Sequence, residues 1–232
     1  MIVGVTPPLA LVIEDAARVE TEIAADRAHV AVCGPGDMRG RLRDHGIKPV
    51  DRGMPGDLAP ALLTLGAEVD IAGPFGKRTI PLETLYIGFA RQDVPVTETQ
   101  GDGKYYLSLR PGELVTAVRA KNTAGLRSAY DKIRIRRSIE YPVAGVAVAL
   151  RKDKGKLADL RIAFTGTNPR PVLLAGTAEL CGGSVDERVI KGLDALVRDH
   201  IMPMKTSFTP GHYRRRVAGV LARRLLARLF ES

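Results

Sequence analysis

Residues 127–168 read RSAYDKIRIRRSIEYPVAGVAVALRKDKGKLADLRIAFTGTN, and this stretch decides the fold. Its first part alternates apolar and charged side chains with the period of two that is typical of a half-buried strand. Apolar runs at Val143–Leu150 and Leu160–Phe164 predict two further strands. The connection at Lys152–Lys156 is short and polar and contains Gly155, so we expect an antiparallel meander of three strands.

Basic side chains gather on the first of these strands, and a small polar turn ends the last one. Lys132, Arg134 and Arg136 share one face, because side chains on a strand alternate with a period of two. The turn is Thr165–Asn168, in which Gly166, Thr167 and Asn168 can offer N–H and hydroxyl groups. Such a combination suits an anionic or carbonyl-rich ligand. The same residues also fit a solvated strand face, salt bridges between subunits and an ordinary turn.

Upstream and downstream segments supply further helices and strands. Asp57 precedes an apolar helical pattern that it can cap, and Gly66 follows as a helix stop. We expect a hairpin of Ala67–Ala72 with Lys77–Ile80, a short helix or turn at Pro81–Tyr86, a strand at Glu113–Arg119, a helix from a capping box at Ser184 and Glu187 to about His200, and a last helix that opens at Thr209 or Pro210.

Together these elements predict an α+β fold. A small β-hairpin and helix portion precedes a C-terminal domain, in which a three-stranded antiparallel sheet packs against helices. We expect three segments, 1–50, 51–120 and 121–232, of which the first is partly loop because it is rich in Gly, Pro and Arg from Cys33 onward.

The charge is strongly basic, with a formal net value of +9 over 232 residues. A nucleic-acid partner is one reading of this charge. We favour arginines on helix faces that complement acidic sister subunits, because the Arg residues lie inside amphipathic patterns and aromatic residues are only 5% of the chain.

Cysteine and histidine are few and scattered. Cys33 and Cys181 lack Cys-x-x-Cys spacing, so a disulfide framework is not indicated and a reducing cytoplasm fits. The four His residues form no metal-binding spacing, and we expect no metal site. The apolar start, Met1–Ile13, is too short to span a bilayer and lacks the basic region of a signal peptide.

Two more stretches give the sequence a family likeness. Residues 56–85 read GDLAPALLTLGAEVDIAGPFGKRTIPLETL, and residues 209–230 read TPGHYRRRVAGVLARRLLARLF. With residues 127–168, these stretches resemble the FAD-binding medium subunit of the molybdenum hydroxylases, the family of xanthine dehydrogenase and carbon monoxide dehydrogenase. In amino-acid sequence, the resemblance is nearest to the 4-hydroxybenzoyl-CoA reductase beta subunit.

The resemblance implies a flavoprotein subunit, whole or shortened, that would be an oxidoreductase component if it binds FAD. Electrons would pass through the flavin between iron–sulfur centres and an external donor or acceptor. Molybdopterin and the iron–sulfur clusters would belong to a large and a two-cluster small partner subunit. Segment 51–120 would be the remnant of the FAD-binding middle subdomain, and 121–232 the C-terminal flavoprotein subdomain. No catalytic residue is implied, and the implied cofactor-binding residues are Asp57, Lys132, Arg134, Arg136, Gly166, Thr167 and Asn168.

The sequence departs from the family pattern upstream of Gly56. Two glycine-rich loops for the FAD pyrophosphate are not visible in Met1–Asp51. Cys33 alone also cannot hold the iron–sulfur cluster of the 4-hydroxybenzoyl-CoA reductase branch, which needs four thiolates. An alternative is therefore a non-catalytic assembly or docking subunit that has lost FAD binding.

Overall fold

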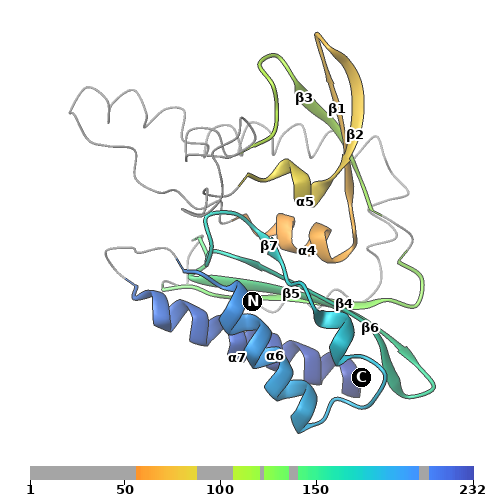
Figure 1. The fold of residues 1–232 in the computed structure, drawn as a ribbon, viewed down its shortest axis with the longest axis vertical. Coiled ribbons are helices and arrows are strands. Elements are labelled where there is room, and N and C mark those ends of the chain that lie inside the picture. The colour runs from red at the N-terminus through yellow and green to blue at the C-terminus, as the bar shows by residue number, and fades with distance from the viewer. Residues whose placement is uncertain (1–55, 88–106, 121–122, 136–140, 204–208) are drawn as a thin grey trace. The chain divides into compact units, whose positions relative to one another are not determined.

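The computed structural model describes residues 56–87, 107–120, 123–135, 141–203 and 209–232 (Figure 1). All of them lie in one of the two compact units of the chain, which comprises Met1–Gly4 and Arg52–Ser232. The other unit, Val5–Asp51, lies outside the described residues, and so do the N-terminal expectations above.

The stretch around residues 127–168 forms the expected antiparallel meander. Its strands are β4 (Arg127–Ile133), β5 (Ala144–Asp153) and β6 (Lys156–Thr165). Lys154 and Gly155 join β5 to β6 with positive φ angles of 48° and 77°, as a tight two-residue hairpin requires. A two-residue strand, β7 (Val172–Leu173), pairs with β6 and makes the sheet four-stranded in the order β4-β5-β6-β7.

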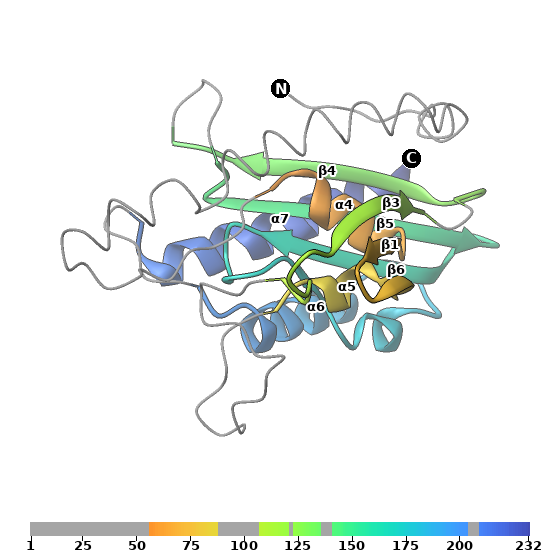
Figure 2. The same cartoon turned by 90° about the horizontal axis from the view of Figure 1, so that it is seen from above.

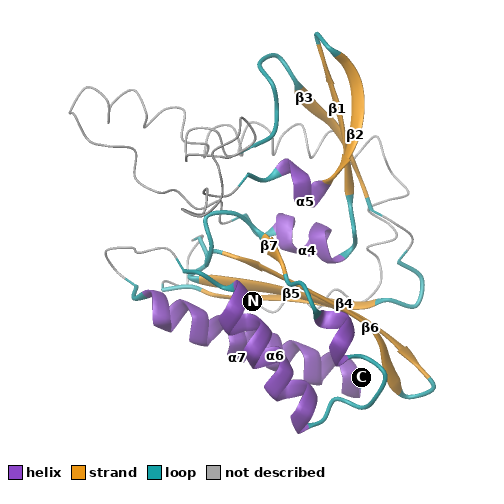
Figure 3. Cartoon of the chain, viewed as in Figure 1, coloured by secondary structure: helices purple, strands orange, loops and turns teal. Residues whose placement is uncertain are grey.

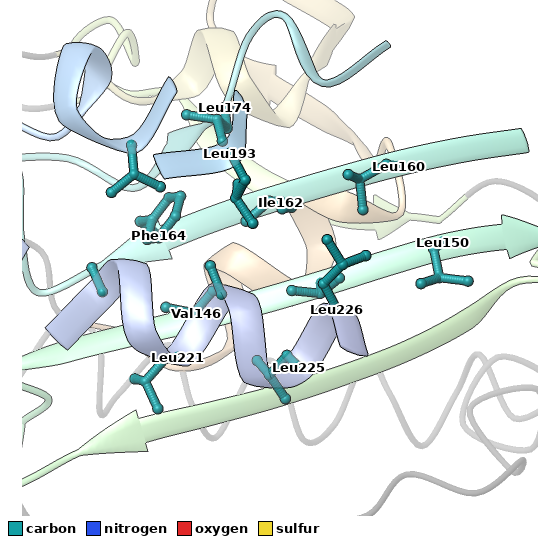
Figure 4. Close-up of a cluster of buried hydrophobic side chains, with 14 of the residues drawn as sticks. Val146, Leu150, Leu160, Ile162, Phe164, Leu174, Leu193, Leu221, Leu225 and Leu226 are labelled. Atoms are coloured by element: carbon teal, nitrogen blue, oxygen red, sulfur yellow. The ribbon is translucent and has the colours of Figure 1, made fainter. Parts of the chain in front are cut away.

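Two helices cover one face of this sheet. They are α6 (Glu187–His200) and α7 (Gly211–Glu231), and Figures 1 and 3 show them on the same side of the strands. Alternate residues of β5 and β6 point toward them, and Figure 4 shows these side chains meeting those of the helices. The strand residues that form this surface, here called the helix face, are Ala144, Val146, Val148, Leu150, Leu160, Ile162 and Phe164.

The start of α6 corrects one expectation. Asp186, and not Ser184, is the N-cap, because its carboxylate accepts a hydrogen bond from the backbone N–H of Val189 at 3.0 Å. The helix end at His200 and the opening of the last helix after Pro210 are confirmed.

A second sheet contains the predicted hairpin. Its strands β1 (Glu68–Gly73) and β2 (Gly76–Pro81) pair as expected, and β3 (Leu114–Arg119) pairs with the other edge of β1. Two short helices flank the hairpin, α4 (Leu58–Thr64) before it and α5 (Leu82–Leu85) after it.

The opposite face of the four-stranded sheet lies under α4. Helix α4 contacts β5 and β6, and Ala163 of β6 belongs to the small core that holds Leu63 of α4 and Ile71 of β1. In Figure 2, α4 and α7 overlap strands β5 and β6, one in front of the sheet and the other behind it. Figure 1 shows the two helices on opposite sides of these strands. We call this surface the α4 face; its residues are Tyr130, Lys132, Gly145, Ala147, Ala163 and Thr165. The α+β fold class is thus confirmed, with a four-stranded sheet in place of a three-stranded one.

Candidate functional site

Asp57 stands where the sequence places it, directly before α4, yet its side chain does not cap the helix. Its backbone is helical, with φ −79° and ψ −31°, and not the extended conformation typical of a capping residue. Instead, its carboxylate accepts a hydrogen bond from the hydroxyl of Tyr130 at 2.8 Å and forms an ion pair with Nζ of Lys132. The capping role is therefore wrong for this side chain, because partners on β4 hold it.

Strand geometry explains why two residues of β4 meet one carboxylate. Tyr130 and Lys132 are two positions apart, so both point to the α4 face. Across the sheet, Lys132 pairs with Gly145, and Gly145 pairs with Thr165. One row of this face therefore joins the basic strand to the first residue of the polar turn.

Gly145 leaves the space that Tyr130 occupies. A Cβ atom built on Gly145 would lie 2.4 Å from the Tyr130 hydroxyl and 2.7 Å from Cγ2 of Thr165. Both distances are far inside van der Waals contact. A glycine here therefore lets the Tyr130 side chain lie across β5 and reach Asp57.

The cluster of Asp57, Tyr130 and Lys132 is partly open to solvent. The Lys132 side chain is 22% exposed and that of Asp57 is 45% exposed. Burial, and then the hydrogen bond to Asp57, raises the pKa of Tyr130 well above its usual value. Tyr130 is therefore a neutral hydrogen-bond donor, while the ion pair keeps an accessible side for a ligand.

The polar turn after β6 is fixed from two directions. Gly166 has a positive φ of 73°, and a Cβ atom there would lie 2.5 Å from the carbonyl oxygen of Pro142, so only glycine fits. From α7, Nη1 of Arg214 donates to the carbonyl oxygens of Val143 at 2.9 Å and Gly166 at 2.7 Å. Desolvation lowers the pKa of Arg214, yet arginine remains charged at any physiological pH.

Thr167 and Asn168 carry buried polar atoms that lack partners within the described part of the chain. These atoms are the Thr167 hydroxyl and Oδ1 of Asn168. Nδ2 of Asn168 donates to the carbonyl oxygen of His200 at 3.1 Å, so this side chain is engaged at the C-terminal end of α6. Buried polar atoms are normally satisfied by protein, water or ligand, so the turn has unused hydrogen-bonding capacity.

The predicted site residues fall into groups in the structure. Asp57 and Lys132 contact each other, and Gly166 follows the row that contains Lys132. Arg134 lies just past the end of β4 and is half-buried, and Arg136 lies outside the described residues. The sequence interpretation did not include Tyr130 among the candidate site residues, although its place two positions before Lys132 puts both on one strand face.

The described residues form neither a metal site nor a membrane-spanning helix. Among the described residues, no group of three His, Cys, Asp or Glu side chains could hold a metal ion. None of the helices placed by the structure has the length and apolar character needed to cross a bilayer.

Known proteins resemble both the sequence and the fold. Residues 128–229 match the CO dehydrogenase flavoprotein C-terminal domain. The carbon monoxide dehydrogenase medium chain of Afipia carboxidovorans is 30% identical over 179 residues, which is 76% of this chain and 57% of that protein. The glyceraldehyde dehydrogenase medium chain of Sulfolobus acidocaldarius is 26% identical over 120 residues, 51% of this chain and 42% of the relative.

A solved structure extends the likeness to three dimensions. Reconstituted CO dehydrogenase from Oligotropha carboxidovorans matches with a TM-score of 0.65 and 28% identity, over 78% of this chain and 59% of that one. The chain thus spans less than two thirds of the relatives that it matches. A particular closeness to 4-hydroxybenzoyl-CoA reductase stays a prediction. Residues 128–229 match the CO dehydrogenase flavoprotein C-terminal domain, and this match, together with the similar medium chain and the similar solved structure, confirms the resemblance of the chain to the medium subunits of molybdenum hydroxylases.

Proposed function

We propose that the chain is an FAD-binding flavoprotein subunit of a molybdenum-containing hydroxylase or dehydrogenase. The observation that carries the proposal is the cluster of Asp57, Tyr130 and Lys132 on the α4 face, within a domain of flavoprotein type. The flavin supplies electron-transfer chemistry when bound, and the chain supplies binding and electrostatics.

The residues of the α4 face suit the ring end of a flavin. That ring is flat, carries carbonyl and N–H groups, and gains negative charge on reduction. Lys132 offers a half-buried cation for that charge, and Asp57 has acceptor capacity beyond its two contacts. Gly145 adds no side chain to the row between them and the turn.

The turn at Gly166 and Thr167 would complete the ring contacts. Its backbone is held by Arg214, and the Thr167 hydroxyl is a buried polar group without a partner in the described ranges. A donor of this kind is stabilised by a ring carbonyl. Arg134, Arg136 and Asn168 stay in the proposal as further contacts, although the Asn168 amide is already bonded to α6.

The proposed role is electron relay between iron–sulfur centres of a small partner subunit and an external donor or acceptor. Substrate chemistry would take place at molybdopterin on a large partner subunit. In support, the two similar medium chains are named for different substrates, carbon monoxide and glyceraldehyde. A shared subunit type with differing substrates fits a task that is common to all, such as electron transfer, better than substrate selection.

The test is the flavin content of the full chain purified with its co-expressed partner subunits. We expect flavin absorbance and the release of FAD on denaturation. Lys132→Gln should weaken FAD binding about tenfold, because a hydrogen bond to a charged group is lost. Lys191→Gln is a matched control, since Lys191 is 75% exposed on α6 in an ion pair with Glu187.

A folded, colourless wild-type protein that takes up no FAD would contradict the proposal. If that protein still associated with its partner subunits, the assembly or docking role would replace it.

A further inference from the structure

We infer that Tyr130 is a positioning residue for the flavin: its hydroxyl holds one oxygen of the Asp57 carboxylate and so keeps the other oxygen on Lys132. The inference rests on the proposed function and adds to it a residue that acts through Asp57. The geometry behind it is the pair of contacts that Tyr130 and Lys132 make with opposite oxygens of the same carboxylate.

The backbone N–H groups at the start of α4 compete with β4 for the Asp57 carboxylate. It is the residue directly before α4, where the first backbone N–H groups of a helix lack intrahelical acceptors. An aspartate at this position ordinarily turns its carboxylate toward those groups. Here no such hydrogen bond forms, and both oxygens are engaged by β4. Without the Tyr130 hydroxyl, the carboxylate is free to rotate toward α4 and away from Lys132.

Tyr130 is itself confined to this arrangement. A side chain at Gly145 would collide with its hydroxyl, so the ring occupies a slot that only glycine at that position allows. Its raised pKa, caused first by burial, keeps the proton on the hydroxyl, and the bond to Asp57 therefore runs from tyrosine to carboxylate. The other charged neighbour that acts on this hydroxyl is Asp131, which also favours the protonated form.

The electrostatic consequence concerns Lys132. Paired with Asp57, its charge is partly neutralised where the flavin ring would lie. If the carboxylate turned away, the ammonium would act on the ring without compensation and would stabilise the reduced, more negative flavin. Tyr130 would thus set both the affinity for the flavin and its reduction potential, although it need not touch the ring.

The experiment is a double-mutant cycle on flavin affinity in the full chain with its partner subunits. Tyr130→Phe removes one hydroxyl and should weaken FAD binding about tenfold. The same change made in Asp57→Asn should have a much smaller effect, because the charged acceptor is already gone. Tyr213→Phe serves as the control, since Tyr213 is 45% exposed on α7.

A second measurement separates positioning from a loss of folding. The flavin midpoint potential of Tyr130→Phe should rise relative to wild type, while that of Tyr213→Phe should not change. Thermal unfolding of each apoprotein shows which variants remain folded.

The outcomes distinguish the inference from the proposed function. Wild type that binds FAD, with Tyr130→Phe unchanged in affinity and potential, overturns the role of Tyr130 and leaves the function standing. An equal loss in the Asp57→Asn background also overturns it, because the effect would not pass through Asp57. A wild type that binds no FAD overturns both.

Discussion

The two faces of the four-stranded sheet are built from the same strands and differ in what they place there. The helix face carries large apolar side chains such as Ile162 and Phe164, all buried against α6 and α7. The α4 face carries small residues such as Gly145 and Ala147, with a charged cluster toward β4. Because side chains alternate along a strand, one stretch of sequence encodes the buried core surface and the proposed binding surface at once.

Truncation on the helix face should have the largest effect on stability. Phe164 is fully buried, so Phe164→Ala removes a large side chain and leaves a cavity. We expect a loss of about 3–5 kcal/mol in the free energy of unfolding, measured by chemical denaturation. A loss below 1 kcal/mol would show that this surface is not the core.

The next largest effect on stability is expected from losing the hydrogen bonds that join α7 to the start of β5 and the end of β6. Arg214→Met keeps most of the apolar stem and removes the donor to Val143 and Gly166. The two carbonyl groups lose their charged partner, and we expect a cost of about 1–3 kcal/mol together with weaker flavin binding. Arg216→Met, at an exposed position on the same helix, is the control and should change neither quantity.

A change on the α4 face should act mainly on flavin binding. Gly145→Ala introduces a methyl group that meets the Tyr130 hydroxyl, so the tyrosine must move. We expect about 1–3 kcal/mol of destabilisation from overpacking and a clear drop in flavin occupancy. Ala144→Gly, one residue away on the helix face, should lower stability and leave the occupancy of the folded protein unchanged. Equal flavin loss in both variants would erase the distinction between the faces.

The smallest effect is expected in the second sheet, away from both faces. Glu113 accepts hydrogen bonds from Nε of Arg78 at 3.0 Å and Nη2 at 2.8 Å, and from the backbone of Arg110. The Arg78 hydrogen bonds lower the pKa of Glu113 to about 2 from 4.5. Its stabilising contribution is therefore fully present above pH 4.5 and is lost as the pH falls toward 2. Wild type and Glu113→Gln, compared by denaturation across that window, should differ in slope; parallel curves would contradict this assignment.

The sequence predicted the long strands far better than the short strand β7 and the exact start of α6. Alternation located β4, and continuous apolar runs located β5 and β6, because each of these strands is long enough to show its pattern. The two residues of β7 are too few to show any pattern. Asp186 and Ser184 are both good capping residues, and the sequence alone does not say which of them makes the capping hydrogen bond; in the structure it is Asp186.

The candidate site was harder to predict than the strands, because it depends on contacts between residues far apart in the sequence. The basic strand face indicated Lys132 as a ligand contact and the family resemblance implied Asp57, but nothing local in the sequence indicated that the two side chains touch. Tyr130 and Asp57, whose side chains are hydrogen-bonded, are 73 positions apart in the chain. Local propensity favours a capping role for Asp57, and tertiary contact overrides it.

The most direct test of the account compares one change on each face by FAD titration of the apoprotein, with unfolding measured on the same samples. Lys132→Gln should lower the affinity for FAD about tenfold and leave the free energy of unfolding within about 1 kcal/mol of wild type. Ile162→Val should lower that free energy by about 1 kcal/mol and leave the affinity unchanged. If Lys132→Gln bound FAD as tightly as wild type, the α4 face would not be the flavin surface, and the account would be contradicted.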